Sequence, residues 1–175
     1  LLGLGRKSME EVRGRDVSMI FQEPMTCLNP VFTIGTQMTD VIRTHEKISK
    51  EEAFKKAVSL LEEVHIRNAE DVNSCYRYEL SGGMRQRVMI AIALSCHPKL
   101  LIADEPTPAL DVTVQAQIHY LIKDPSRNLK TAVLFISHDL GVISEICDSI
   151  SVMYSGHIVE SGDTASGLSE PCHPY

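Results

Sequence analysis

The sequence has no apolar run of the length that a membrane-spanning helix requires, which is about 20 residues. Its longest apolar run, residues 88–94, comes directly after Arg87 and predicts a helix of the protein core. We therefore expect any membrane association to come through a partner. The length of 175 residues and the 43% hydrophobic content indicate one globular domain with a core of ordinary size.

The chain also lacks paired cysteines and an excess of basic residues. Its 5 cysteines form no C-x-x-C pair, which signals neither a disulfide framework nor a zinc site and favours a reducing cytoplasm. The 17 Lys and Arg residues are outnumbered by 23 Asp and Glu residues, which gives a formal net charge of -6. This balance argues against a nucleic-acid groove, so we expect no nucleic-acid partner.

Three β-prone runs alternate with helical patterns, and polar residues follow each run. This order predicts an α/β layer fold with a mostly parallel sheet, in which polar residues lie at the strand ends where such sheets bind ligands. The second run is apolar throughout, as expected of a strand that is buried on both faces of a parallel sheet, and we expect the third run to be buried as well. The runs and the residues that follow them are 17–21 with Gln22, 100–103 with Asp104 and Glu105, and 131–136 with Ser137 and His138.

The segment between Gln22 and Ser81 is helical in pattern and predicts an inserted lobe. Ser49 and Glu52 match a capping box that opens a helix. That helix is expected to place five apolar side chains on one face: Phe54, Ala57, Val58, Leu61 and Val64.

Further elements are expected on both sides of the second strand. Residues 84–95 and 112–123 predict helices, and Pro125 is expected to end the second one, since an interior proline costs about 3 kcal/mol. Ser155-Gly156 is a turn signal between residues 148–154 and 157–160, which predicts a β-hairpin.

Asp104 and Glu105 are adjacent at a strand end, so their side chains point in different directions. One can hold Mg²⁺ while the other orients and deprotonates an attacking water molecule. The alternative is a pair of surface carboxylates that cap the loop before Pro106. The long apolar run before them favours the chemical interpretation.

His138 and Gln22 are weaker candidates. An imidazole at a strand end can donate to a γ-phosphate oxygen or bridge to the attacking water, although a lone histidine is more often structural. Gln22 can ligate Mg²⁺ or bind the water without titrating, and the alternative is an ordinary loop amide.

Ser81-Gly82-Gly83 opens the helix that begins near Met84. Backbone N–H groups and the positive end of a helix dipole converge at such a turn, which makes it an anion site. A plain helix N-cap with a flexible lead-in is the alternative. Arg85 and Arg87 follow, and we expect at least one of them to lie on a solvated face.

These residues resemble the ATP-binding cassette (ABC) ATPases, and within them the oligopeptide and dipeptide importer branch, which includes nickel importers. Gln22 matches the Q-loop, and Ser137-His138 matches the H-loop. Residues 80–84 match the signature motif, and residues 100–105 match the Walker B strand. The branch is indicated by longer stretches at residues 20–26, 28–30, 84–91 and 173–175.

The resemblance implies a P-loop NTPase-like (RecA-like) core, a mostly parallel sheet flanked by helices, with an inserted α-helical subdomain and with the N-terminal part of the fold missing. It implies four parts of a partial ABC ATPase domain: a core strand and Q-loop in 1–24, the helical subdomain with the signature motif in 25–96, the core with Walker B, D-loop and H-loop in 97–160, and the start of a C-terminal extension in 161–175.

The resemblance also implies the roles of individual residues toward ATP and Mg²⁺. Glu105 would be the general base, Asp104 the Mg²⁺ carboxylate, His138 the γ-phosphate contact and Gln22 the sensor of metal and water. The turn Ser81-Gly82-Gly83 would contact ATP that a second cassette holds. Asp111 ends the segment 107–111, which resembles the D-loop.

The implied partners are a second ABC ATPase subunit, identical or paralogous, integral membrane permease subunits and, indirectly, a substrate-binding protein. The implied place is the cytoplasmic face of the plasma membrane, and the implied function is ATP hydrolysis that energises peptide uptake. A non-catalytic remnant of such a subunit, and a soluble cassette ATPase that acts on ribosomes or DNA, are the alternatives.

Two departures from the family pattern bear on activity. A phosphate-binding loop, G-x-x-x-x-G-K-[ST], is absent from the 175 residues, because Arg6 separates Gly5 from Lys7 in the one similar stretch. We expect the loop to lie upstream and this fragment to be inactive by itself. In the D-loop segment, Pro108 stands where the branch usually has threonine; proline removes one backbone donor and fixes φ, and we expect it to weaken coupling between the cassettes.

Overall fold

The computed structural model describes residues 3–22, 27–107, 111–128 and 131–174. The chain divides into two compact units, Leu1–Leu134 and Phe135–Tyr175. The first unit contains the parallel sheet strands and most of the helices, and the second contains an antiparallel hairpin between short helices.

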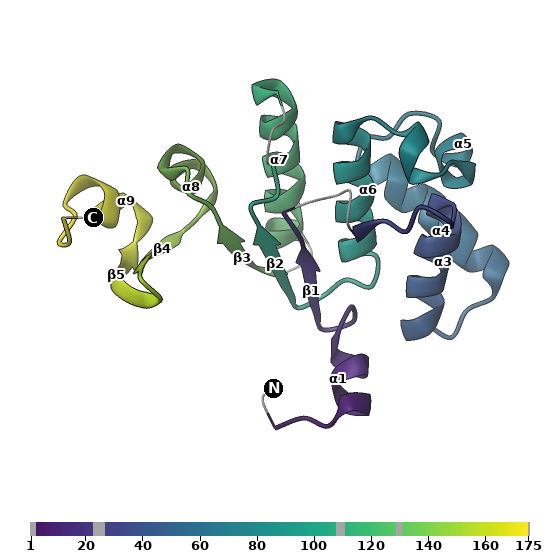
Figure 1. Cartoon of the computed structure of the whole chain (residues 1–175), viewed down its shortest axis with the longest axis horizontal. Coiled ribbons are helices and arrows are strands. Elements are labelled where there is room, and N and C mark those ends of the chain that lie inside the picture. The colour runs from purple at the N-terminus through teal and green to yellow at the C-terminus, as the bar shows by residue number, and fades with distance from the viewer. Residues whose placement is uncertain (1–2, 23–26, 108–110, 129–130, 175) are drawn as a thin grey trace. The chain divides into compact units, whose positions relative to one another are not determined.

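The centre of the first unit is a parallel strand pair. β1 (Val17–Ile20) lies beside β2 (Leu100–Asp104), in a register that pairs Ile20 with Ala103, and the sheet order is β1-β2-β3 (Figure 1). β3 (Ala132–Ile136) begins in this unit, where the backbone N–H of Ala132 donates to the carbonyl of Lys99 at 2.8 Å. The predicted α/β fold with parallel strands is confirmed.

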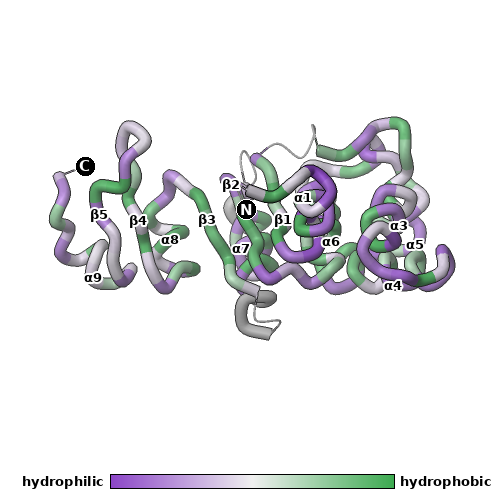
Figure 2. Tube along the Cα trace, turned by 90° about the horizontal axis from the view of Figure 1, so that it is seen from below, coloured by the Kyte–Doolittle hydropathy of each residue, from purple (hydrophilic) through white to green (hydrophobic). Residues whose placement is uncertain are grey.

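The burial of these strands differs from the expectation. In β2, Leu101 and Ala103 are fully buried, while the side chains between them are only partly buried. β3 is apolar along its length (Figure 2), yet Leu134 is 51% exposed. The prediction of strands buried on both faces is therefore wrong for this chain, because such burial requires helices against both faces of the sheet.

Helices fill the segment between the first and second strands. After α1 (Arg6–Val12) and β1, they form a lobe in which α3, α4 and α5 pack against one another and α4 packs on α6, which in turn contacts β1 and α7 (Figure 1). Their bounds are α3 (Ile34–His45), α4 (Lys50–Glu63), α5 (Ala69–Ser74), a 3₁₀ turn at Arg77–Glu79 and α6 (Gly82–Leu94), and α7 (Val112–Asn128) follows β2 in the chain.

The start of α4 is the predicted capping box. The Ser49 hydroxyl accepts from the Glu52 backbone N–H at 3.2 Å, and the Glu52 carboxylate accepts from the Ser49 backbone N–H at 2.8 Å. These two bonds satisfy donors that every helix start leaves without an intrahelical acceptor.

The expected apolar face of α4 is confirmed for Ala57, Leu61 and Val64 but is wrong for Phe54, which is 42% exposed, and Ala53 and Leu60 are buried as well. The expectation for α7 is wrong. α7 does not end at Pro125 but continues to Asn128. Its buried side chains, such as Ile118 and Ile122, fix α7 against the unit, and this packing outweighs the local cost of one proline.

The second unit contains the predicted hairpin. β4 (Ser149–Tyr154) pairs antiparallel with β5 (His157–Asp163). The two turn residues have left-handed backbones, with φ of 47° at Ser155 and 80° at Gly156, as a two-residue type I′ turn requires. The helices of this unit are α8 (Leu140–Ile146), which Asp139 caps, and α9 (Thr164–Ser169).

Candidate functional site

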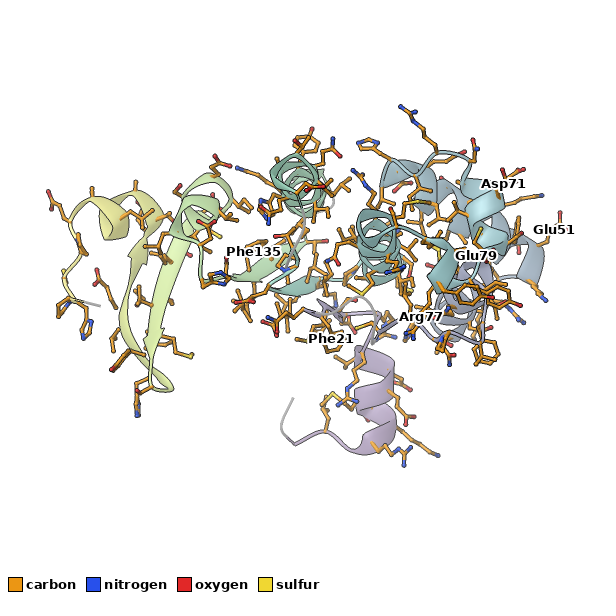
Figure 3. The ribbon with its side chains drawn as sticks, turned by 45° about the horizontal axis from the view of Figure 1, so that its top comes forward. Phe21, Glu51, Asp71, Arg77, Glu79 and Phe135 are labelled. Carbon is orange, nitrogen blue, oxygen red and sulfur yellow. The ribbon has the colours of Figure 1, made fainter. Side chains whose placement is uncertain are left out.

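The structure brings together two of the predicted site residues, Gln22 and Glu105. Because β1 and β2 are parallel, their carboxyl ends meet at one edge of the sheet, and each residue lies two positions beyond the paired Ile20 and Ala103. The Gln22 amide Nε2 donates to the Glu105 Oε2 at 2.6 Å. Gln22 is exposed and Phe21 beside it is 51% exposed (Figure 3), whereas Asp104 and Glu105 are half-buried.

Glu105 has a strained backbone. Its φ is 41°, in the left-handed region that costs a residue with a side chain roughly 1–2 kcal/mol. Such conformations persist where surrounding contacts impose them, and they cluster at functional sites. This conformation lies directly after β2, at the residue whose carboxylate accepts from Gln22.

The contacts that fix this turn come from α6 and α7. Gln86 of α6 donates its Nε2 to the carbonyl of Pro106. Gln115 of α7 donates its Nε2 to the carbonyl of Thr107 at 3.1 Å. The Thr107 hydroxyl lies 3.1 Å from Nε2 of the buried His119. Hydrogen bonds from α6 and α7 therefore hold Pro106 and Thr107, the two residues that follow the predicted base Glu105.

The same strand ends offer oxygen ligands for a divalent cation. Asp104 is the last residue of β2, and the amide nitrogen of Gln22 is engaged by Glu105, so Gln22 would approach a cation through Oε1. Mg²⁺ in nucleotide sites takes one or two protein oxygens together with phosphates and water. In the described ranges no group of three or more His, Cys, Asp or Glu residues could hold a metal by itself. This donor set fits a cation that a nucleotide brings with it.

The turn at residues 81–83 opens α6 as a capped helix. The Ser81 hydroxyl accepts from the Met84 backbone N–H at 3.3 Å, and the helix that follows has 13 residues. The N-cap alternative is therefore correct for the local structure. A Cβ at Gly83 would lie 3.2 Å from Cγ1 of Val114 in α7, so the turn packs closely on that helix.

Arg85 and Arg87 do not lie on a solvated face, and that expectation is wrong for both. Arg85 donates its Nε to the carbonyl of Arg77 at 2.8 Å. Arg87 donates to the carbonyl of Val64 at 2.6 Å and to Oε1 of Gln117 at 2.5 Å. Partial burial lowers the pKa of Arg87. Arg87 therefore joins the end of α4 to α7 through α6.

The remaining predicted residues belong to other elements of the chain. His138 is exposed and belongs to the second unit, where the neighbouring Ser137 hydroxyl accepts from the Asp139 backbone N–H at 3.0 Å. Asp111 is exposed directly before α7, and its carbonyl accepts from the Gln115 backbone N–H at 2.9 Å. Pro108 lies outside the described residues.

Sequence reasoning missed the residues that support the site. Gln86, Gln115 and His119 reach the segment after Glu105 from two helices, and no local motif marks such contacts. A signal for Gln86 does exist in the sequence, since it is a polar residue on a helix whose following residues, 88–91, are all apolar. None of the described helices is both long and apolar enough to cross a membrane.

Comparison with known proteins gives relatives along the whole chain. It is 58% identical over its full length to the probable D,D-dipeptide transport ATP-binding protein DdpD of Escherichia coli (strain K12), of which it covers 53%. It is 54% identical over its full length to the oligopeptide transport ATP-binding protein OppD of Bacillus subtilis (strain 168), of which it covers 49%. The chain spans about half the length of these relatives.

Solved structures and a family model agree with this similarity. The ATP-binding cassette MJ0796, in a dimeric post-hydrolysis state bound to ADP and Pi, matches with a TM-score of 0.82 and 25% identity, over 93% of this chain and 68% of that one. The cbiO1 protein from Clostridium perfringens matches with a TM-score of 0.78 and 25% identity, over 95% of this chain and 64% of that one. A family model described as ABC transporter matches residues 4–108. The chain therefore belongs to the ABC transporter family.

Proposed function

We propose that this chain is the larger part of the ATPase domain of an ABC importer that energises the uptake of peptides or related solutes. The observation that carries the proposal is the Gln22 to Glu105 hydrogen bond of 2.6 Å at the ends of two parallel strands, in a chain that is 54–58% identical to peptide transport ATP-binding proteins. An amide that cannot titrate holds one oxygen of a carboxylate there, and this carboxylate would serve as the base.

In this mechanism Glu105 accepts the proton of the attacking water. The water oxygen bonds to the γ-phosphorus as the bond to the β-γ bridging oxygen breaks, which leaves ADP and phosphate. Gln22 orients Glu105 and the water through hydrogen bonds. His138 donates to a γ-phosphate oxygen.

Asp104 and Oε1 of Gln22 would hold Mg²⁺. When bound, this ion would neutralise negative charge on the phosphates. The turn Ser81-Gly82-Gly83 would contact ATP held by a second cassette, with Asp111 near the contact between the cassettes. The dimeric state of the MJ0796 cassette supports such pairing. Membrane permease subunits and a substrate-binding protein would complete the importer at the cytoplasmic face of the membrane.

The proposal applies to the longer protein, since the 175 residues contain no phosphate-binding loop for the β- and γ-phosphates. We expect the 175-residue chain to have no measurable ATP affinity by calorimetry. Tight binding by this chain would contradict that part of the proposal.

The test is Glu105→Gln in the full-length protein. The variant should bind ATP as the wild type does but lose hydrolysis by about 100- to 10,000-fold, the usual contribution of a general base. Glu51→Gln, on the outer surface of the helical lobe (Figure 3), is the control and should hydrolyse normally. Near-normal turnover by Glu105→Gln would remove Glu105 from the role.

Uptake of labelled dipeptides by vesicles that contain the assembled transporter tests the substrate class. Uptake should depend on ATP and disappear with Glu105→Gln. Co-purification with integral membrane subunits is expected, and co-purification with ribosomes instead would contradict the importer.

A further inference from the structure

A buried glutamine in the middle of α6 has no role in the proposed mechanism. Gln86 is fully buried, and the described part of the chain contains no hydrogen-bond partner for its Oε1. Its Nε2 donates to the carbonyl of Pro106, which is itself buried and directly follows Glu105. A buried amide that forms only part of its possible bonds costs free energy that an apolar side chain would avoid, so core packing alone does not account for a glutamine here.

The position of Gln86 on its helix connects two predicted sites. It lies three residues after Gly83, one turn along the same rigid helix from the turn at residues 81–83. Any shift of that turn along or about the axis of α6 therefore moves the Gln86 amide. The amide donates to the carbonyl of Pro106, the residue after Glu105. The φ of 41° at Glu105 depends on surrounding contacts such as this one.

We propose that Gln86 is a positioning residue that couples the turn at residues 81–83 to the Glu105 carboxylate of the same chain. The inference rests on the proposed function, in which the turn contacts ATP held by the partner cassette and Glu105 acts on ATP held by its own chain. Gln86 would thus make the geometry of one ATP site depend on occupancy of the other.

The test uses Gln86→Met in the full-length protein, because methionine has a similar length and volume but no donor. Loss of the bond leaves the buried carbonyl of Pro106 without this donor, and removal of the unpaired Oε1 offsets only part of that cost, so the melting temperature should fall by a few degrees and kcat is measured well below it. Loss of positioning should lower kcat by about 10- to 100-fold, with KM for ATP and ATP affinity nearly unchanged.

The control is Ser95→Ala. Ser95 is a buried polar residue that directly follows α6. Its hydroxyl donates to the carbonyl of Ile92 at 2.8 Å and lies 3.7 Å from Sγ of Cys96, so it contacts neither predicted site. This variant should retain wild-type kcat. A wild-type kcat for Gln86→Met, or a fall in kcat that only follows a fall in melting temperature, would overturn the positioning role.

Coupling requires a further measurement, since closeness in space does not demonstrate it. If the effect of the turn reaches Glu105 through Gln86, the kcat losses of Ser81→Ala and Gln86→Met should not multiply in the double variant. Strictly multiplicative losses would overturn the coupling. The separate Glu105→Gln variant distinguishes the two failures: normal turnover there contradicts the proposed function, whereas its expected loss together with a normal Gln86→Met contradicts only this inference.

Discussion

Gln22 and Glu105 are 83 positions apart in the sequence, yet the amide Nε2 of the first donates to the carboxylate Oε2 of the second at 2.6 Å. The contact follows from the parallel register of β1 and β2, which places equivalent positions beyond both strands at the same sheet edge. An amide in this place holds the carboxylate without adding a charge. The chemical nature of Gln22 should therefore set the pH range of activity.

Gln22→Glu should move the acidic limb of the kcat/KM profile to higher pH. A second carboxylate at this distance disfavours ionisation of its neighbour, so the pair in this variant should retain a proton to higher pH. Glu105 serves as a base only when it is ionised, so activity should be lost at a higher pH than in the wild type. Gln22→Ala is the matched control, which removes the donor without adding charge, and it should lower kcat while leaving the limb in place. An unmoved limb in Gln22→Glu would contradict the contact.

Arg87 should be important for stability, and lysine should not replace it. Arg87 donates to the carbonyl of Val64 at 2.6 Å and to Oε1 of Gln117 at 2.5 Å, and a lysine ammonium cannot reproduce this fork. Arg87→Lys should lower the free energy of unfolding by about 1–3 kcal/mol, since hydrogen bonds from charged groups contribute this much. Denaturant unfolding of the full-length protein measures it. Arg67→Lys at an exposed position is the control, and an equal effect of both variants would refute the argument.

Much of this arrangement follows from local sequence. The capping box at Ser49 and Glu52, the two-residue turn at Ser155-Gly156 and the meeting of Gln22 with Glu105 each depend on a short pattern or on strand parallelism. The prediction that Pro125 ends α7 was wrong for a related reason. The rule that proline ends a helix describes an isolated helix and does not include the tertiary packing that holds α7.

Long-range contacts explain what the sequence did not reveal. Charged residues such as Arg85 and Arg87 are typical of a solvated helix face. Here, however, they donate to the backbone carbonyls of Arg77 and Val64 and to the side-chain amide of Gln117, which belong to other elements. Gln86 likewise finds Pro106 only through the packing of α6 beside the strand ends. Phe54 was placed on the buried face of α4 because it is bulky and apolar, but the small Ala53 beside it is the buried residue.

Gly35→Ala should destabilise the helical lobe, although alanine normally stabilises a helix interior relative to glycine by up to about 1 kcal/mol. A Cβ at Gly35 of α3 would lie 2.3 Å from Oδ1 and 2.7 Å from the backbone oxygen of Asn73 in α5. Asn73 is buried and its backbone cannot retreat without opening the contact between the two helices. We expect a loss of about 1–3 kcal/mol, the usual cost of overpacking.

Thermal or denaturant unfolding of the full-length protein measures this loss. The control is Gly5→Ala, since a Cβ there would meet nothing within 4 Å. A stabilised Gly35→Ala variant would show that α3 and α5 do not approach as closely as the structure has them.

The segment that includes Cys172 and His173 should detach from β5 in acid. Glu160 accepts from the Cys172 backbone N–H at 3.0 Å and from the His173 backbone N–H at 2.8 Å. These bonds, the one from Cys172 first, lower the pKa of Glu160 below its ordinary value of 4.5. A carboxyl group with a depressed pKa contributes stability that is fully present above the ordinary value and is lost as the pH falls through the lowered one.

Amide chemical shifts of residues 172 and 173, followed by NMR from about pH 6 to pH 3, should therefore change together with one midpoint below the ordinary value for glutamate. In Glu160→Gln the shifts should not depend on pH over this range, because the amide has no proton to gain. Glu170→Gln alters a nearby carboxyl group outside this contact and should leave the midpoint in place. Shifts that change at the ordinary value in the wild type would show that Glu160 does not hold this segment.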